Sequence, residues 1–166
     1  MLFRSTNSNI DLASTIIKWL EDSKDYLSST IVSRIQHETG YRNEHSIHDE
    51  LVSHATQFEA ISYGALKIDK KYDYPIDNYG TQKMKAGISK ILSKADESDI
   101  GKGIGNLRNE IAHVGKSKQL LKSLSIRDMV NINLYLQMTI LGYILDGLGL
   151  DKSMITKYQD KFTPDV

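Results

Sequence analysis

One short segment of the chain combines the side chains that phosphodiester chemistry uses. Arg108, Asn109 and His113 stand close together in the stretch Gly103-Ile104-Gly105-Asn106-Leu107-Arg108-Asn109-Glu110-Ile111-Ala112-His113-Val114-Gly115-Lys116. The planar guanidinium of an arginine binds a phosphate through two hydrogen bonds and stabilises charge that develops in a transition state. A histidine gains and loses a proton near neutral pH, so it can act as a general acid or base. These residue types indicate a site for a phosphodiester.

The spacing in this segment predicts a helix that turns its polar side chains away from the core. On a helical wheel with about 100° per residue, one narrow arc holds the apolar residues Ile104, Leu107, Ile111 and Val114. Asn109 and His113 are four residues apart on the far side of the wheel, and Arg108 lies at the edge of the arc. An ordinary surface helix with a histidine near its C-terminus, where the helix dipole favours a cation, has the same spacing.

Basic side chains gather around this segment although the whole chain is neutral, with 21 basic and 21 acidic residues. Residues 83–127 carry ten basic and four acidic side chains, whereas the parts of the chain before and after them are net acidic. A basic surface attracts phosphates. We therefore expect Lys102, Lys116 and Lys118 to bind phosphate groups, although runs of charge are commonly only solvated faces.

Apolar residues at helical spacing predict the elements that position the segment. We expect long helices over residues 11–35, 44–66, 82–95 and 126–148, and a short helix from Leu107 to about His113. Asn43 and Ser125 are the expected N-caps of the second and the last long helix, and Gly115 is the expected end of the short one. The chain length suits one domain over residues 1–166.

We expect two connections between these helices. Residues 69–81 contain Pro75, Gly80 and three tyrosines, which predict a loop whose rings either stack on bases or cover the edge of the core. Residues 96–105 are acidic and then rich in glycine, which predicts a second connection. The alternating glycines there follow no predicted strand and lack a Lys-Ser/Thr pair, so they do not indicate a phosphate-binding loop.

The last long segment carries two conflicting patterns. Six residues alternate as in a strand: Val130, Ile132, Leu134, Leu136, Met138 and Ile140. The same segment also carries two stripes at helical spacing, Val130, Leu134, Met138, Leu141 and Leu145, and Met129, Ile132, Leu136, Ile140 and Ile144. The segment is too long for a typical strand. We therefore expect a helix that is buried in the centre of the fold or in an interface, and an all-α protein.

Composition excludes several classes of function. The chain has no cysteine, which excludes a disulfide scaffold, a thiol nucleophile and a thiolate metal site. Polar residues interrupt the most apolar segment, residues 129–150, and no signal peptide is visible, so we expect a cytoplasmic protein without membrane contact. His45 and His48 are spaced to share a metal ion, but no further ligand is visible, so we expect neither a metal nor another cofactor.

The segment Arg108-Asn109-Glu110-Ile111-Ala112-His113 resembles the hallmark of the HEPN superfamily, an arginine, often followed by asparagine, and then a histidine four to six residues further on. The small residues of the lead-in from Gly103 to Leu107 are similar too, and so is the long apolar helix after a basic loop. The resemblance is best over residues 82–150 and is closest to HEPN domains of the abortive-infection and ApeA-like C-terminal type.

This resemblance implies an all-α, up-and-down bundle of four to five core helices with extra short helices, which usually dimerises. Many HEPN domains are metal-independent endoribonucleases of toxin–antitoxin, abortive-infection or CRISPR-linked systems, and their paired Arg and His residues meet in a cleft between two protomers. By this resemblance Arg108 would hold the phosphate, His113 would act as general acid or base, and Asn109 would orient one of them. The products would carry 2′,3′-cyclic phosphate and 5′-hydroxyl ends.

The resemblance leaves two functions open. The first is a metal-independent endoribonuclease that cleaves single-stranded RNA as a homodimer, as a toxin or an antiviral-defence effector. The second is a non-catalytic HEPN module that dimerises and binds a nucleotide or a partner protein. Outside the resemblance, a purely structural helical interaction domain is a third possible function. Because ApeA-like HEPN domains usually end longer proteins, an antitoxin or an N-terminal sensor domain is a further partner to consider.

Overall fold

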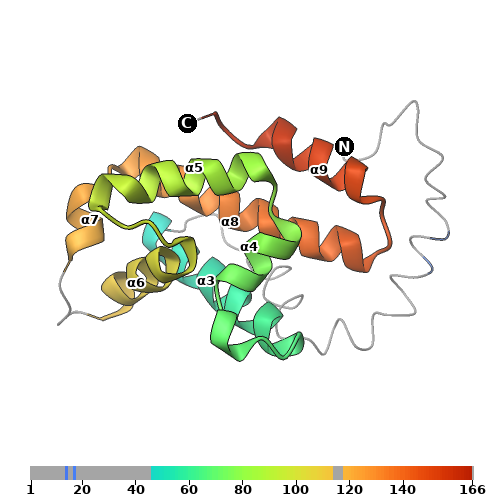
Figure 1. The fold of residues 1–166 in the computed structure, drawn as a ribbon, viewed down its shortest axis with the longest axis horizontal. Coiled ribbons are helices and arrows are strands. Elements are labelled where there is room, and N and C mark those ends of the chain that lie inside the picture. The colour runs from blue at the N-terminus through green and yellow to red at the C-terminus, as the bar shows by residue number, and fades with distance from the viewer. Residues whose placement is uncertain (1–13, 15–16, 18–45, 114–117, 166) are drawn as a thin grey trace.

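The computed structural model describes residues 14, 17, 46–113 and 118–165, which form an all-α bundle without strands (Figure 1). Its elements are α3 (Ile47–Gly64), η1 (Ile68–Lys70), α4 (Asp73–Tyr79), α5 (Gln82–Leu92), η2 (Ser93–Ala95), α6 (Ile100–Ala112), α7 (Gln119–Ser123), α8 (Ile126–Gly147) and α9 (Lys152–Phe162). The all-α prediction is confirmed. The helix expected over residues 11–35 lies outside the described residues, apart from Ser14 and Ile17, which are helical.

Helix α8 is the central element, and α3, α4, α5 and α9 all pack against it. Figure 1 shows α5 and α8 running in opposite directions along the length of the bundle. Helix α6 contacts α3 and α5. The core between these helices contains large, fully buried side chains, among them Leu51, Phe58, Ile88, Leu107 and Leu136.

The helical reading of the last long segment is confirmed, and so is its cap. The Ser125 hydroxyl accepts a hydrogen bond from the backbone N–H of Asp128 at 3.2 Å. The Asp128 carboxylate in turn accepts one from the backbone N–H of Ser125 at 3.0 Å. This reciprocal capping box satisfies two N–H groups that a helix start otherwise leaves unpaired. The strand-like alternation does not decide the structure, because a helix buried on several sides needs apolar residues in more than one stripe.

Two further predicted helices are confirmed, with small shifts at their ends. The second runs over Ile47–Gly64, and its N-cap is Ser46 in place of the expected Asn43. The Ser46 hydroxyl accepts a hydrogen bond from the backbone N–H of Asp49 at 3.1 Å. The third comprises α5 and the single turn η2, which together cover residues 82–95.

The loop expected over residues 69–81 is wrong, because most of this segment is helical in η1 and α4. Pro75 stands in the first turn of α4, where a backbone N–H has no helical partner, so proline does not break the helix there. The tyrosine rings cover the core edge: Tyr79 packs edge-on against Tyr74 and Tyr143, with ring centroids 6.3 and 5.2 Å away.

The connection expected over residues 96–105 is also wrong in its second half, because α6 begins at Ile100 and contains all three alternating glycines. Asp99 caps this helix by accepting a hydrogen bond from the backbone N–H of Lys102 at 2.7 Å. A β-carbon at Gly103 would lie 2.5 Å from a methyl group of Leu92. The glycines therefore serve close packing of neighbouring side chains on α6, not a turn.

The sequence analysis did not predict α9. Its start carries a readable signal, since Asp151 accepts hydrogen bonds from the backbone N–H groups of Ser153 (2.9 Å) and Met154 (3.4 Å). Ile155 and Gln159 form its buried face. The Gln159 amide donates to the carbonyl oxygens of Tyr79 and Met138 at 2.7 and 2.8 Å, and so ties α9 to α4 and α8.

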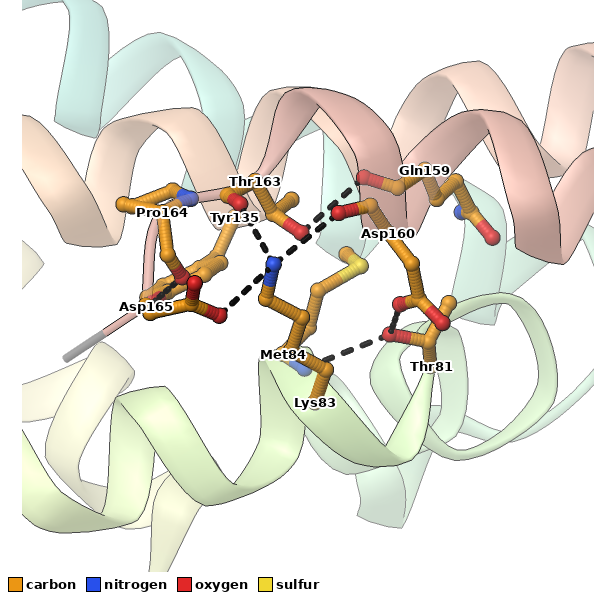
Figure 2. Close-up of polar contacts among 9 residues, drawn as sticks. All are labelled: Thr81, Lys83, Met84, Tyr135, Gln159, Asp160, Thr163, Pro164 and Asp165. Atoms are coloured by element: carbon orange, nitrogen blue, oxygen red, sulfur yellow. Dashed lines mark hydrogen bonds and ion pairs between the residues drawn. The ribbon is translucent and has the colours of Figure 1, made fainter.

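The end of α9 is fastened to the start of α5 (Figure 2). The Lys83 ammonium donates to the carbonyl oxygens of Asp160 and Thr163 at 2.9 and 2.8 Å, and pairs with the Asp165 carboxylate at 2.9 Å. The Thr81 hydroxyl donates to the Asp160 carboxylate at 2.6 Å. Lys83 thus satisfies carbonyl groups that the C-terminus of a helix leaves unpaired.

The junction between α6 and α7 is fixed by two reciprocal caps. The Glu110 carboxylate is buried and accepts hydrogen bonds from the backbone N–H groups of Leu120 and Leu121, at 3.1 and 3.0 Å, in the first turn of α7. The Lys118 ammonium donates to the carbonyl oxygens of Glu110 and His113 at the end of α6. Glu110, the acidic residue within the Arg108–His113 motif, is therefore part of the framework.

We expect Gly87→Ala to lower the free energy of unfolding by about 1–3 kcal/mol, the usual cost of overpacking a core. A β-carbon at Gly87 would lie 2.6 Å from Cζ of the fully buried Tyr135 ring, whose hydroxyl is held by the Pro164 carbonyl at 3.0 Å. Gly64→Ala is the matched control, since nothing lies within 4 Å of its β-carbon and alanine favours a helix. Urea unfolding of the two variants makes the comparison, and equal stability would contradict close packing of α5 on α8.

We expect Glu110→Ala to lower the free energy of unfolding by about 1–3 kcal/mol, because two backbone N–H groups of α7 lose their acceptor. Glu110→Gln keeps one acceptor oxygen and should fall between Ala and wild type. Thermal melts followed by circular dichroism rank the three proteins. A Glu110→Ala protein that melts with the wild type would show that the cap does not stabilise the junction.

Candidate functional site

Helix α6 positions the candidate site and buries the face that the wheel predicts. Ile104 and Leu107 are buried, and Ile111 packs partly buried against the core. The helix ends at Ala112, and the backbone N–H of His113 donates to the carbonyl oxygen of Asn109 at 3.1 Å. The backbone of His113 is extended, so His113 is the first residue beyond the helix.

Arg108 is half-buried at the edge of the apolar face, as the wheel predicts. Its Nη1 donates to Oδ1 of Asn109 at 3.1 Å, whereas its Nε is buried without a hydrogen-bond partner. No ion pair joins Arg108 to an acidic residue within residues 46–113 and 118–165. Among the described residues, no carboxylate therefore competes with a phosphate for this guanidinium.

His113 is exposed at the end of α6. Asn109 accepts hydrogen bonds from both other residues of the motif, from Arg108 through its side chain and from the backbone N–H of His113 through its carbonyl oxygen. Within one chain, Arg108 is half-buried at the edge of the core, whereas His113 is exposed past the end of the helix.

The lysines expected to bind phosphate lie in different settings. Lys102 is exposed and pairs with the Glu97 carboxylate at 3.1 Å. The Lys118 ammonium is bonded to the carbonyl oxygens at the end of α6, as described above. Lys116 lies outside the described residues. Phosphate binding by all three stays a prediction.

One side chain that the sequence analysis did not connect with the site, Tyr72, lies against α6, and a second, Glu59, is hydrogen-bonded to it. The Tyr72 ring occupies the space above Gly105, whose β-carbon would lie 2.8 Å from Cε2 of the ring. Gly105 precedes Arg108 by three residues, so the two are neighbours on the helix surface. The Tyr72 hydroxyl donates a hydrogen bond to the Glu59 carboxylate of α3.

The environment of Tyr72 keeps its hydroxyl protonated. Burial raises the pKa of Tyr72 well above its ordinary value, and the hydrogen bond and negative charge of Glu59 raise it further. The positive charge of Arg108 acts in the opposite direction on the same pKa. Tyr72 is therefore a hydrogen-bond donor at neutral pH.

The alternation of glycines at 101, 103 and 105 was the one sequence signal that a side chain approaches α6 here.

Within the described ranges, no three His, Cys, Asp or Glu side chains cluster as metal ligands. His48 is exposed at the start of α3, and His45 lies outside those ranges. None of the helices in the described part of the chain is both long enough and apolar enough to cross a membrane.

Comparison with known proteins identifies the family of the chain. A family model described as Apea-like HEPN matches residues 3–154, a range that includes Arg108, Asn109 and His113. No curated protein and no solved structure matches the chain. The family match extends well beyond the short motif and covers most of the sequence. The chain therefore belongs to the Apea-like HEPN family.

Proposed function

We propose that this protein is a metal-independent endoribonuclease that cleaves single-stranded RNA, with Arg108 and His113 as its catalytic residues. The observation that carries the proposal is the state of Arg108: Asn109 holds its guanidinium, and no described acidic side chain neutralises it. An exposed His113 follows at the end of the same helix. This arrangement suits a phosphodiester, and membership of a HEPN family supports it.

The proposed reaction uses the ribose 2′-hydroxyl as the nucleophile. One His113 takes the proton of the 2′-hydroxyl as its oxygen attacks phosphorus, and a protonated His113 gives a proton to the leaving 5′-oxygen. Arg108 binds the phosphate oxygens and stabilises the charge that grows on them. The products carry a 2′,3′-cyclic phosphate and a 5′-hydroxyl.

We propose that two protomers complete the site. One chain carries one His113, and the reaction uses both an acid and a base. Ile126 and Val130, one turn apart at the start of α8, are 73% and 44% exposed and give an apolar surface for pairing. Figure 1 shows the start of α8 at the same end of the bundle as α7, which contacts α6.

A non-catalytic HEPN module that dimerises and binds a nucleotide or a partner protein is the second candidate. The bonding of Lys118 favours it, because this ammonium already satisfies carbonyl oxygens of α6 and is not free for RNA in this conformation. In either role we propose a cytoplasmic protein of a toxin or antiviral-defence system, partnered by an antitoxin or a sensor domain.

We expect His113→Ala and Arg108→Ala each to slow RNA cleavage by on the order of 10²–10⁴, because each removes a group that acts in the transition state. Arg108→Lys should also be poor, since an ammonium does not reproduce the two-point contact of a guanidinium. A fluorescent RNA is incubated with each protein in EDTA, and the product ends are mapped.

His48→Ala and Lys157→Ala are the controls, because both residues are exposed and lie outside the motif and the basic segment. They should cleave at the wild-type rate. A His113→Ala protein that cleaves as fast as wild type would refute the catalytic role, and so would products with 3′-hydroxyl ends. A folded wild type that binds RNA and never cuts it would favour the non-catalytic module.

We expect a homodimer that buries more than roughly 1,000 Å² in total. Ile126→Asp with Val130→Asp should convert it to a monomer, because charges then enter an apolar interface. Leu66→Asp is the control, since Leu66 is 84% exposed and lies just after α3, outside the proposed interface. Light scattering coupled to gel filtration measures the mass. A wild type that is monomeric at micromolar concentration would contradict the dimer.

A further inference from the structure

Tyr72 reaches the candidate site through a gap in the surface of α6. Gly105 has no side chain, and the Tyr72 ring fills that space, in contact distance of the helix. Arg108 and Asn109 follow Gly105 by three and four residues and lie on the adjacent helix surface. The phenol is therefore seated on the part of α6 that carries the guanidinium.

Glu59 and Arg108 both lie near the Tyr72 hydroxyl, since the charge of each acts on the pKa of that group. Glu59 stands in the middle of α3, which packs against α6, and its carboxylate accepts the hydrogen bond of the Tyr72 hydroxyl. A carboxylate beside an arginine commonly forms a two-point ion pair with it. Here no such pair joins Glu59 and Arg108, both of which are described residues.

Without this ion pair, one buried N–H group of Arg108 has no hydrogen-bond acceptor. Arg108 Nε is buried and has no hydrogen-bond partner, and a buried donor without an acceptor is unfavourable. A Glu59 carboxylate turned towards the guanidinium would relieve that cost. It would also occupy the N–H groups that a phosphate needs.

We propose that Tyr72 is a positioning residue that holds the Glu59 carboxylate away from Arg108 and so keeps the guanidinium free for an RNA phosphate. The inference rests on the proposed function, in which Arg108 binds the scissile phosphate. Tyr72 itself does not touch the reacting atoms in this account. It acts through its hydrogen bond to the Glu59 carboxylate, which keeps that carboxylate from pairing with Arg108.

The test is a double-mutant cycle on RNA binding and cleavage. The proteins are wild type, Tyr72→Phe, Glu59→Gln, the double variant Tyr72→Phe/Glu59→Gln, and Arg108→Ala. Binding is measured by fluorescence anisotropy with an RNA that is 2′-O-methylated throughout and cannot be cut, and cleavage with the unmodified RNA. Tyr63→Phe is the control for the substitution type, because Tyr63 is 48% exposed on α3.

Tyr72→Phe should weaken RNA binding by on the order of tenfold, as for the loss of a hydrogen bond to a charged group. Glu59→Gln should bind as wild type does, since a neutral amide does not compete for Arg108 as an anion does. The double variant should return to within about threefold of wild type, because removing the competing charge makes Tyr72 unnecessary. A merely structural role of Tyr72 would not be rescued by a second substitution.

Two results overturn the inference alone: Tyr72→Phe binds RNA as wild type does, or the double variant stays as weak as Tyr72→Phe, while Arg108→Ala shows its loss. If Arg108→Ala neither weakens binding nor slows cleavage, the proposed function is wrong and the inference falls with it. A wild type that binds the methylated RNA without cutting the unmodified one leaves the binding cycle to decide. Melting temperatures of all variants verify that each protein is folded.

Discussion

The close approach of side chains to α6 is the constraint on which the rest of the structure depends. At Gly103 and Gly105 the helix surface has no side chains, so Leu92 of α5 and Tyr72 before α4 occupy the vacated space. Each contact fixes the height and the rotation of α6 against its neighbours, because a packed core does not slide continuously. The motif at the end of α6 is thereby held in one orientation relative to the bundle.

The polar residues at the end of α6 divide into two groups with different tasks. Glu110 and Lys118 hydrogen-bond to the backbone, where each satisfies groups that a helix end leaves unpaired. The side chains of Arg108 and His113 do not cap a helix end: Arg108 forms no ion pair with any described residue, and His113 is exposed. A lysine in a basic segment therefore does not necessarily bind phosphate. Lys118 is hydrogen-bonded to carbonyl oxygens at the end of α6 instead.

Helical periodicity predicted the elements whose apolar stripes are long. The stripe from Met129 to Ile140 and the Ser125 cap were sufficient for α8, and the arc of Ile104, Leu107 and Ile111 for the buried face of α6. Glycine and proline caused the errors. Their statistical association with turns outweighed the local pattern at Pro75 and in the first half of α6, where the deciding factors were a free N–H position and a tertiary contact.

Only those residues of the candidate site that are close together in the sequence could be predicted. Arg108, Asn109 and His113 are neighbours in sequence, so their spacing placed them on one short helix. The Glu59–Tyr72 pair comes from α3 and the segment before α4, and no periodicity connects these positions to Arg108. Such a contact is a product of the fold, and a single sequence contains no direct signal for it.

The fastening of α9 to α5 has a consequence for the order in which the bundle forms. The bonds from Lys83 to Asp160 and Thr163 join residues 77 and 80 positions apart in sequence. Contacts of such separation pay the largest loop-closure entropy and follow local helix formation in time. During synthesis, Lys83 precedes its acceptor Asp160 by 77 residues. We therefore expect α9 to dock on α5 after the local helices have formed.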